Sequence, residues 1–145
     1  MKLTPQFLAE VVNALSCPPA AAGKGAEKRR AARMEVEGNV VVAPLLNDGT
    51  IGQSFTAVTR DISFVGIGLL QSKRVALGDR IVVRLPRGTR DALFVHCKVQ
   101  HVRPLADGLY VIGAEFAGMS GIKEEDMLGR AADTVLHRVR ELILN

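Results

Sequence analysis

The pattern that decides the fold lies in residues 93–116, LFVHCKVQHVRPLADGLYVIGAEF. Apolar and polar side chains alternate from Leu93 to Val99, and they alternate again from Tyr110 to Phe116. A period of two is typical of a strand that buries one face. Asp107-Gly108 separates the two runs, and this dipeptide is common in tight hairpin turns. The stretch therefore predicts two antiparallel strands joined by a hairpin.

The same alternation extends toward the N-terminus and predicts four more strands. The first covers residues 34–42, and the others cover 54–62, 66–70 and 81–85. Turn signals between them are Asn47-Asp48-Gly49, Gly78-Asp79 and Pro86-Arg87-Gly88. Short strands with regular turn signals favour a closed barrel or a sandwich. The expected fold is mainly β, with a six-stranded antiparallel barrel over residues 29–118.

Helical spacing is confined to the two ends of the chain. Residues 1–15 predict an N-terminal amphipathic helix, because Thr4 can cap it, Pro5 suits its first position, and apolar residues recur at helical spacing from Phe7 to Leu15. A helix of about three turns has little stability alone. It is expected to dock on the barrel, on a second copy of the chain or on a partner.

Residues 119–145 predict a C-terminal amphipathic helix whose apolar stripe runs from Met127 to Ile143. The favoured interpretation is that this helix covers an open end or face of the barrel. Pairing between subunits, and hence a homodimer, is the alternative. Residues 16–28, SCPPAAAGKGAEK, are rich in Pro, Ala and Gly and predict a flexible linker.

The positive charge of the chain is local. The formal net charge is +4, and residues 24–33, KGAEKRRAAR, alone carry five bases and one acid, so the remainder is neutral. Aromatic residues are 4% of the chain and Trp is absent, which disfavours binding to a nucleic-acid polymer. The N-terminal apolar run is too short to span a membrane, and no signal-peptide pattern follows it. The expected location is the cytoplasm.

Residues with catalytic potential are sparse. Cys17 and Cys97 are far apart and indicate neither a disulfide scaffold nor a zinc site. His96 and His101 are an odd number of residues apart on one strand, so they are expected on opposite faces, and His137 has no matching ligand. No HExxH, GxSxG or GxxxxGKS run is present. We expect no enzymatic activity, no metal and no cofactor.

The first candidate binding motif is Arg29-Arg30-Ala31-Ala32-Arg33, at the end of the linker. Guanidinium groups bind phosphate or the O6/N7 edge of guanine through two parallel hydrogen bonds, and their faces stack on purines. Two arginines on one arm therefore suit an anionic ligand that contains guanine. The alternative is a solvated run of charge.

The second candidate motif is Asp61-Ile62-Ser63-Phe64-Val65-Gly66, at the end of the second predicted strand. Asp61 and Ser63 project from one face of an extended segment, and Gly66 permits a positive φ or the close approach of a ligand. A carboxylate can accept hydrogen bonds from guanine N1–H and N2–H. The alternative is a turn in which Asp61 and Ser63 satisfy backbone donors. Arg60 is expected on the face opposite Asp61.

An RxxxR arm followed by DxSxxG on an all-β pattern resembles the PilZ domain family, over residues 28–118 and the terminal helix. The resemblance implies a six-stranded antiparallel barrel whose usual ligand is the bacterial second messenger cyclic diguanylate (c-di-GMP). It implies that Arg29 and Arg33 grip phosphates and guanine edges, and that Asp61, Ser63 and Gly66 receive a guanine. Arg30 is an additional residue between the motif positions and a secondary candidate.

The implied function is that of a c-di-GMP receptor that orders its arginine arm on binding and relays the signal to a downstream protein partner. The first alternative is a ligand-independent protein-interaction adaptor built on the same barrel. A small barrel that binds RNA through its basic arm ranks below both, because the body is neutral and poor in aromatic residues.

Overall fold

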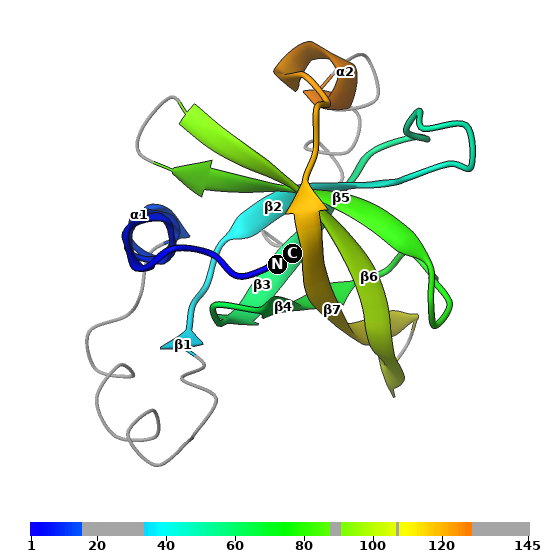
Figure 1. The fold of residues 1–145 in the computed structure, drawn as a ribbon. Helices are drawn as coiled ribbons and strands as arrows, with labels where there is room; N and C mark the ends of the chain where they lie inside the picture. The colour runs from blue at the N-terminus through cyan, green and yellow to red at the C-terminus, as the bar shows by residue number, and fades with distance from the viewer. Residues whose placement is uncertain (16–33, 88–90, 107, 129–145) are drawn as a thin grey trace.

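The computed structural model describes residues 1–15, 34–87, 91–106 and 108–128, which contain seven strands and two helices (Figure 1). Helix α1 covers Pro5–Leu15 and helix α2 covers Glu124–Leu128. The strands are β1 (Met34–Glu35), β2 (Asn39–Pro44), β3 (Phe55–Ile62), β4 (Gly66–Gln71), β5 (Arg80–Arg87), β6 (Asp91–Ala106) and β7 (Leu109–Met119).

Six of these strands form a closed antiparallel barrel. The sheet order is β1-β3-β2-β5-β6-β7-β4, and an additional β3–β4 pairing closes the ring. β1 lies outside the ring and pairs with β3, Met34 opposite Ile62 and Glu35 opposite Asp61. The predicted six-stranded barrel is confirmed, with one extra outside strand.

The alternating apolar residues fill the barrel as expected. Along β6, Leu93, Val95, Cys97 and Val99 are buried, and Ile112, Ala114 and Phe116 of β7 face them in the same core. A second, smaller cluster lies on the outer surface of the barrel, where Met127 of α2 packs with Ala43 and Val82. The described start of the C-terminal helix therefore contacts one face of the barrel, and the rest of the predicted helix lies outside the described residues.

Helix α1 packs on the barrel. The Thr4 hydroxyl accepts a hydrogen bond from Phe7 N at 3.2 Å and caps the helix, as predicted. Leu8, Val11 and Leu15 are buried in the main core, so one face of α1 packs against the core of the barrel. Of the three docking alternatives, the structure shows docking on the barrel.

Two local predictions differ from the structure. The expected strand over 34–42 is split into β1 and β2, because Gly38 adopts a φ of +156° where the backbone of Leu15 packs against it. Pro86 and Arg87 do not form the turn expected at Pro86-Arg87-Gly88, because they are still paired with Ala92 and Asp91 in the β5–β6 ladder. The turn at Asn47-Asp48-Gly49 is confirmed by a hydrogen bond from Gly49 N to Leu46 O and by a φ of +88° at Gly49.

Several predictions fall outside the described residues. They include the linker at 16–28, the arm arginines and the apolar stripe beyond Leu128. Among the helices that the structure describes, none is long and apolar enough to cross a membrane.

Candidate functional site

A groove of about 720 Å³ lies on the outer face of the barrel, where β3, β4, β7 and β6 are adjacent. The second candidate motif contributes four residues to its lining, Asp61, Ser63, Val65 and Gly66. The structure therefore brings the predicted carboxylate, hydroxyl and glycine into one concave surface.

A β-bulge in β3 sets the direction of Asp61. Thr59 pairs with Leu69 and Asp61 pairs with Gly68, so Arg60 is an extra residue without a partner in β4. Thr59 and Ile62 are buried, while Arg60 and Asp61 both face outward and line the groove. The prediction that Arg60 lies opposite Asp61 is wrong, because the bulge interrupts the alternation.

Ser63 closes the turn between β3 and β4. Its hydroxyl accepts hydrogen bonds from Val65 N and Gly66 N, each at 3.2 Å, and its amide donates to Gly66 O at 2.9 Å. The side chain is nearly buried, at 4% exposure. Ser63 thus satisfies backbone donors, as the turn interpretation expected, and it rigidly shapes the edge of the groove next to Asp61.

Gly66 is required by the packing of two strands. A Cβ at this position would lie 2.6 Å from the carbonyl oxygen of Ala114, across the β4–β7 pairing. Among the described glycines, those with positive φ are Gly38, Gly49, Gly78 and Gly108, and Gly66 is not one of them. A glycine at position 66 was expected to allow either a positive φ or the close approach of a ligand. The positive φ is wrong. The close approach that the structure shows is that of the Ala114 backbone.

Sequence reasoning missed two glycines on the floor of the groove, Gly68 and Gly113. They pair with each other across β4 and β7. A Cβ on Gly68 would lie 2.7 Å from Asp61 Oδ1, and a Cβ on Gly113 would lie 3.2 Å from His101 Cδ2. The Asp61 carboxylate and the His101 ring thus occupy the space that two neighbouring side chains would need.

His101 faces the groove because of a second bulge, in β6. Val99 pairs with Ala114 and His101 pairs with Gly113, so Gln100 is the extra residue. His96 also points away from the core, where its Nε2 lies 3.1 Å from Arg80 Nη1. Partial burial and then the charge of Arg80 lower the pKa of His96. The prediction that His96 and His101 lie on opposite faces is wrong.

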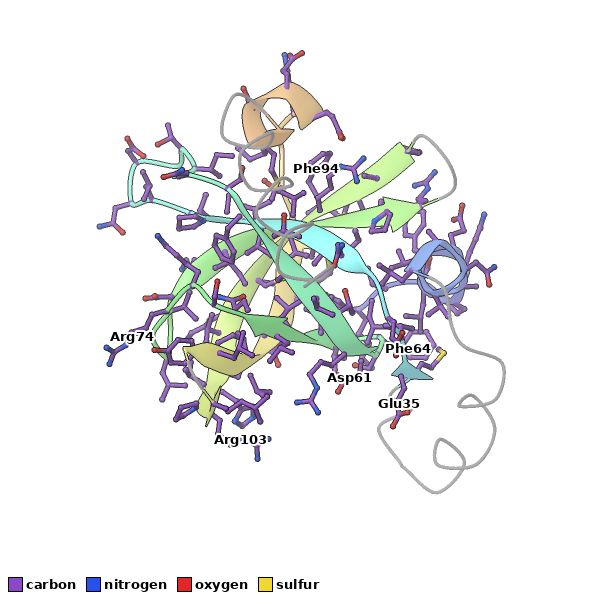
Figure 2. All side chains as sticks on the ribbon, turned by 180° about the vertical axis from the view of Figure 1, so that it is seen from behind. Glu35, Asp61, Phe64, Arg74, Phe94 and Arg103 are labelled. Atoms are coloured by element: carbon purple, nitrogen blue, oxygen red, sulfur yellow. The ribbon has the colours of Figure 1, made fainter. Side chains whose placement is uncertain are left out.

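The arm of the first motif joins the barrel beside this groove. Arg29, Arg30 and Arg33 lie outside the described residues, but β1 begins at Met34, directly after them. Glu35 pairs with Asp61, and Figure 2 shows both side chains at the same edge. Consecutive Cα atoms are about 3.8 Å apart. The arm is therefore attached to the barrel at the rim of the groove.

The N-terminal segment also contacts the turn between β3 and β4. Leu3 N donates a hydrogen bond to Phe64 O at 2.8 Å, and the terminal amine donates to Phe116 O at 3.0 Å. Phe116 N in turn donates to Val65 O at 2.8 Å. The turn at residues 61–66, the DISFVG turn, is thus held by hydrogen bonds from both the N-terminal segment and β7.

The lining of the groove is electrostatically mixed. It includes Arg60 and Arg103 as well as the carboxylates of Asp61 and Glu115. Arg103 is exposed at the end of the barrel that carries the β6–β7 hairpin (Figure 2). Within the described ranges, no three His, Cys, Asp or Glu side chains cluster closely enough to hold a metal ion. The arrangement offers a ligand hydrogen-bond acceptors and donors beside glycines and apolar side chains.

Comparison with known proteins identifies the family. A model of the PilZ domain matches residues 27–131. A search of curated proteins returns no match.

Among solved structures, the chain is similar to three bacterial proteins. The PilZ domain of YcgR from Escherichia coli, solved with c-di-GMP, is 15% identical with a TM-score of 0.46, over 80% of this chain and 97% of that one. MrkH of K. pneumonia in its c-di-GMP complex is 16% identical with a TM-score of 0.49, over 79% and 55%. The Bacillus subtilis inhibitor of motility MotI/DgrA is 13% identical with a TM-score of 0.45, over 81% and 53%.

The chain spans about half the length of MotI and MrkH. The assignment rests on the family model, which covers most of the sequence, including the arm arginines and the DISFVG turn. This chain belongs to the PilZ domain family.

Proposed function

We propose that this protein is a c-di-GMP receptor that binds the nucleotide in the groove beside the DISFVG turn. The observation that carries the proposal is that β1, which follows the arginine motif directly in the chain, pairs with β3 at Asp61 of the second motif. Asp61 and Ser63 line the groove, and β1 attaches the arginine arm opposite Ile62. A dianionic nucleotide that binds in the groove is then within reach of guanidinium groups from the arm.

The roles follow from the chemistry of each group. Asp61 accepts hydrogen bonds from guanine N1–H and N2–H, and the Ser63 turn holds its edge of the groove in shape. Gly66 keeps β4 close to β7, so that the wall beside the guanine is backbone. Arg29 and Arg33 bind phosphates and guanine edges, with Arg30 as a secondary contact. The protein makes and breaks no covalent bond in this function.

Ligand binding orders the arm in this proposal. Residues 24–33 contain five bases and only one acid. The bases repel one another until an anionic ligand neutralises their charge. The arm connects α1 to β1, and the N-terminal segment is hydrogen-bonded to Phe64 of the DISFVG turn. Pinning the arm across the groove therefore changes the surface that α1 and the arm present to a downstream protein partner.

Titration calorimetry with c-di-GMP tests the binding proposal. The wild-type protein should release or absorb heat with saturation at micromolar ligand, whereas Arg29→Ala, Arg33→Ala and Asp61→Ala should each lose about tenfold or more in affinity. Arg74→Ala is the matched control, because Arg74 is exposed and does not line the groove (Figure 2). The absence of heat and of any change in melting temperature for the wild type would refute the proposal.

A further inference from the structure

His101 lies opposite Asp61 on the floor of the groove, and the proposed function gives it no role. Four residues form one row across the sheet: Asp61 pairs with Gly68, Gly68 pairs with Gly113, and Gly113 pairs with His101. The row therefore crosses β3, β4, β7 and β6, with a charged or polar side chain at each end and two glycines between them.

The two end side chains lean toward each other over the glycines. The Asp61 carboxylate fills the place of a side chain on Gly68, and the His101 ring fills the place of one on Gly113. Adjacent strands in a sheet are about 4.8 Å apart. The carboxylate and the imidazole thus lie next to two paired glycines on adjacent strands, and both residues line the groove.

A hydrogen-bond acceptor and a donor that face one groove from the two ends of this row match one edge of guanine. The Watson–Crick edge of guanine carries two donors, N1–H and N2–H, next to one acceptor, O6. A carboxylate accepts from the two donors, and an imidazole N–H can donate to the acceptor. Adenine carries an amino group in place of O6, so a donor at this position favours guanine over adenine.

The geometry points to His101 as a guanine-specificity residue: its ring N–H donates to O6 of the base whose N1–H and N2–H are held by Asp61. This inference rests on the proposed function and extends it to a residue outside both motifs. Gly68 and Gly113 contribute by leaving room for the two side chains to reach the same base.

Two substitutions separate hydrogen bonding from ring packing. His101→Phe keeps a flat ring and removes the N–H donor, whereas His101→Gln keeps an N–H donor and removes the ring. The affinity for c-di-GMP, measured by calorimetry, should fall about tenfold in His101→Phe and stay within about threefold in His101→Gln. His101 is exposed, so both variants should melt like the wild type.

His96→Phe is the matched control, because His96 is on the same strand and the same outer face but does not line the groove. Its affinity should equal that of the wild type. Wild-type affinity in His101→Phe, or an equal loss in His101→Phe and His101→Gln, would overturn the inference. If Asp61→Ala loses binding while His101→Phe does not, the receptor function stands and the role of His101 falls. If the wild type does not bind c-di-GMP, the proposed function itself fails.

Discussion

Replacing Gly68 with alanine tests whether the groove positions Asp61 for ligand binding. The new Cβ would lie 2.7 Å from Asp61 Oδ1, while ordinary contacts begin near 3.4 Å, so the carboxylate must move by about 0.7 Å or rotate. Hydrogen bonds need donor–acceptor distances of about 2.7–3.2 Å, so such a displacement breaks at least one of the two proposed bonds to guanine.

The expected loss of affinity for c-di-GMP follows from the negative charge of the acceptor, the Asp61 carboxylate. A hydrogen bond to a charged group contributes about 1.5–3 kcal/mol, which corresponds to a loss of roughly ten- to a hundredfold in affinity. The stability of the barrel should change little, because the clash is with the end of a side chain and not with backbone.

Calorimetry with c-di-GMP and thermal denaturation should be performed on Gly68→Ala and on Gly118→Ala. Gly118 is a suitable control, because it lies on neighbouring strand β7 and a Cβ there would meet nothing within 4 Å. Gly68→Ala should bind weakly and melt normally, whereas Gly118→Ala should behave as the wild type in both respects. Equal affinities in the two variants would refute the argument that the glycine makes room for a functional carboxylate.

Three further predictions concern stability. Leu8→Ala should lower the free energy of unfolding by about 2–5 kcal/mol in chemical denaturation, because Leu8 is only 2% exposed in the core, and a change below about 0.5 kcal/mol would contradict the docking of α1. Thr59→Val should raise the free energy of unfolding by about 1 kcal/mol, because the Thr59 hydroxyl is buried without a hydrogen-bond partner among the described residues. A loss of stability in this variant would contradict the assignment. Burial raises the pKa of the Cys97 thiol from 9.0 to about 12, so the folded state keeps a proton that the unfolded state loses. Stability should therefore fall as the pH rises from 9 toward 12, and a Cys97→Ala variant with the same alkaline slope as the wild type would argue against this cause.

Periodicity predicted the barrel because its signal is local. Leu93, Val95, Cys97 and Val99 alternate with polar residues within one strand, and this is enough to predict which side chains enter the core. The hairpin turn at Asn47-Asp48-Gly49 was equally predictable, because its residue types favour the turn directly.

The bulges at Arg60 and Gln100 were not predictable in the same way. A bulge is defined by how many residues of one strand oppose a neighbouring strand, and the neighbour of β3 or β6 is known only when the sheet is assembled. Each bulge turned outward a residue that simple alternation would place inside the barrel, Asp61 in one case and His101 in the other.

The candidate site, like the fold, was predictable only in part. The DISFVG motif identified Asp61 and Ser63 by residue type, and the structure places both on the groove. The roles of Gly68 and Gly113 depend on contacts across strands, with Asp61 and with His101, which no local pattern contains. The binding roles of all these residues remain predictions.

The most direct test of the receptor function is an NMR titration of the ¹⁵N-labelled protein with c-di-GMP. We expect saturable changes in the amide signals of residues 60–68, His101 and Gly113, and unchanged signals for Ala43 and Val82, which lie under α2 on a different face. Unchanged signals throughout, or changes confined to the face under α2, would contradict the account.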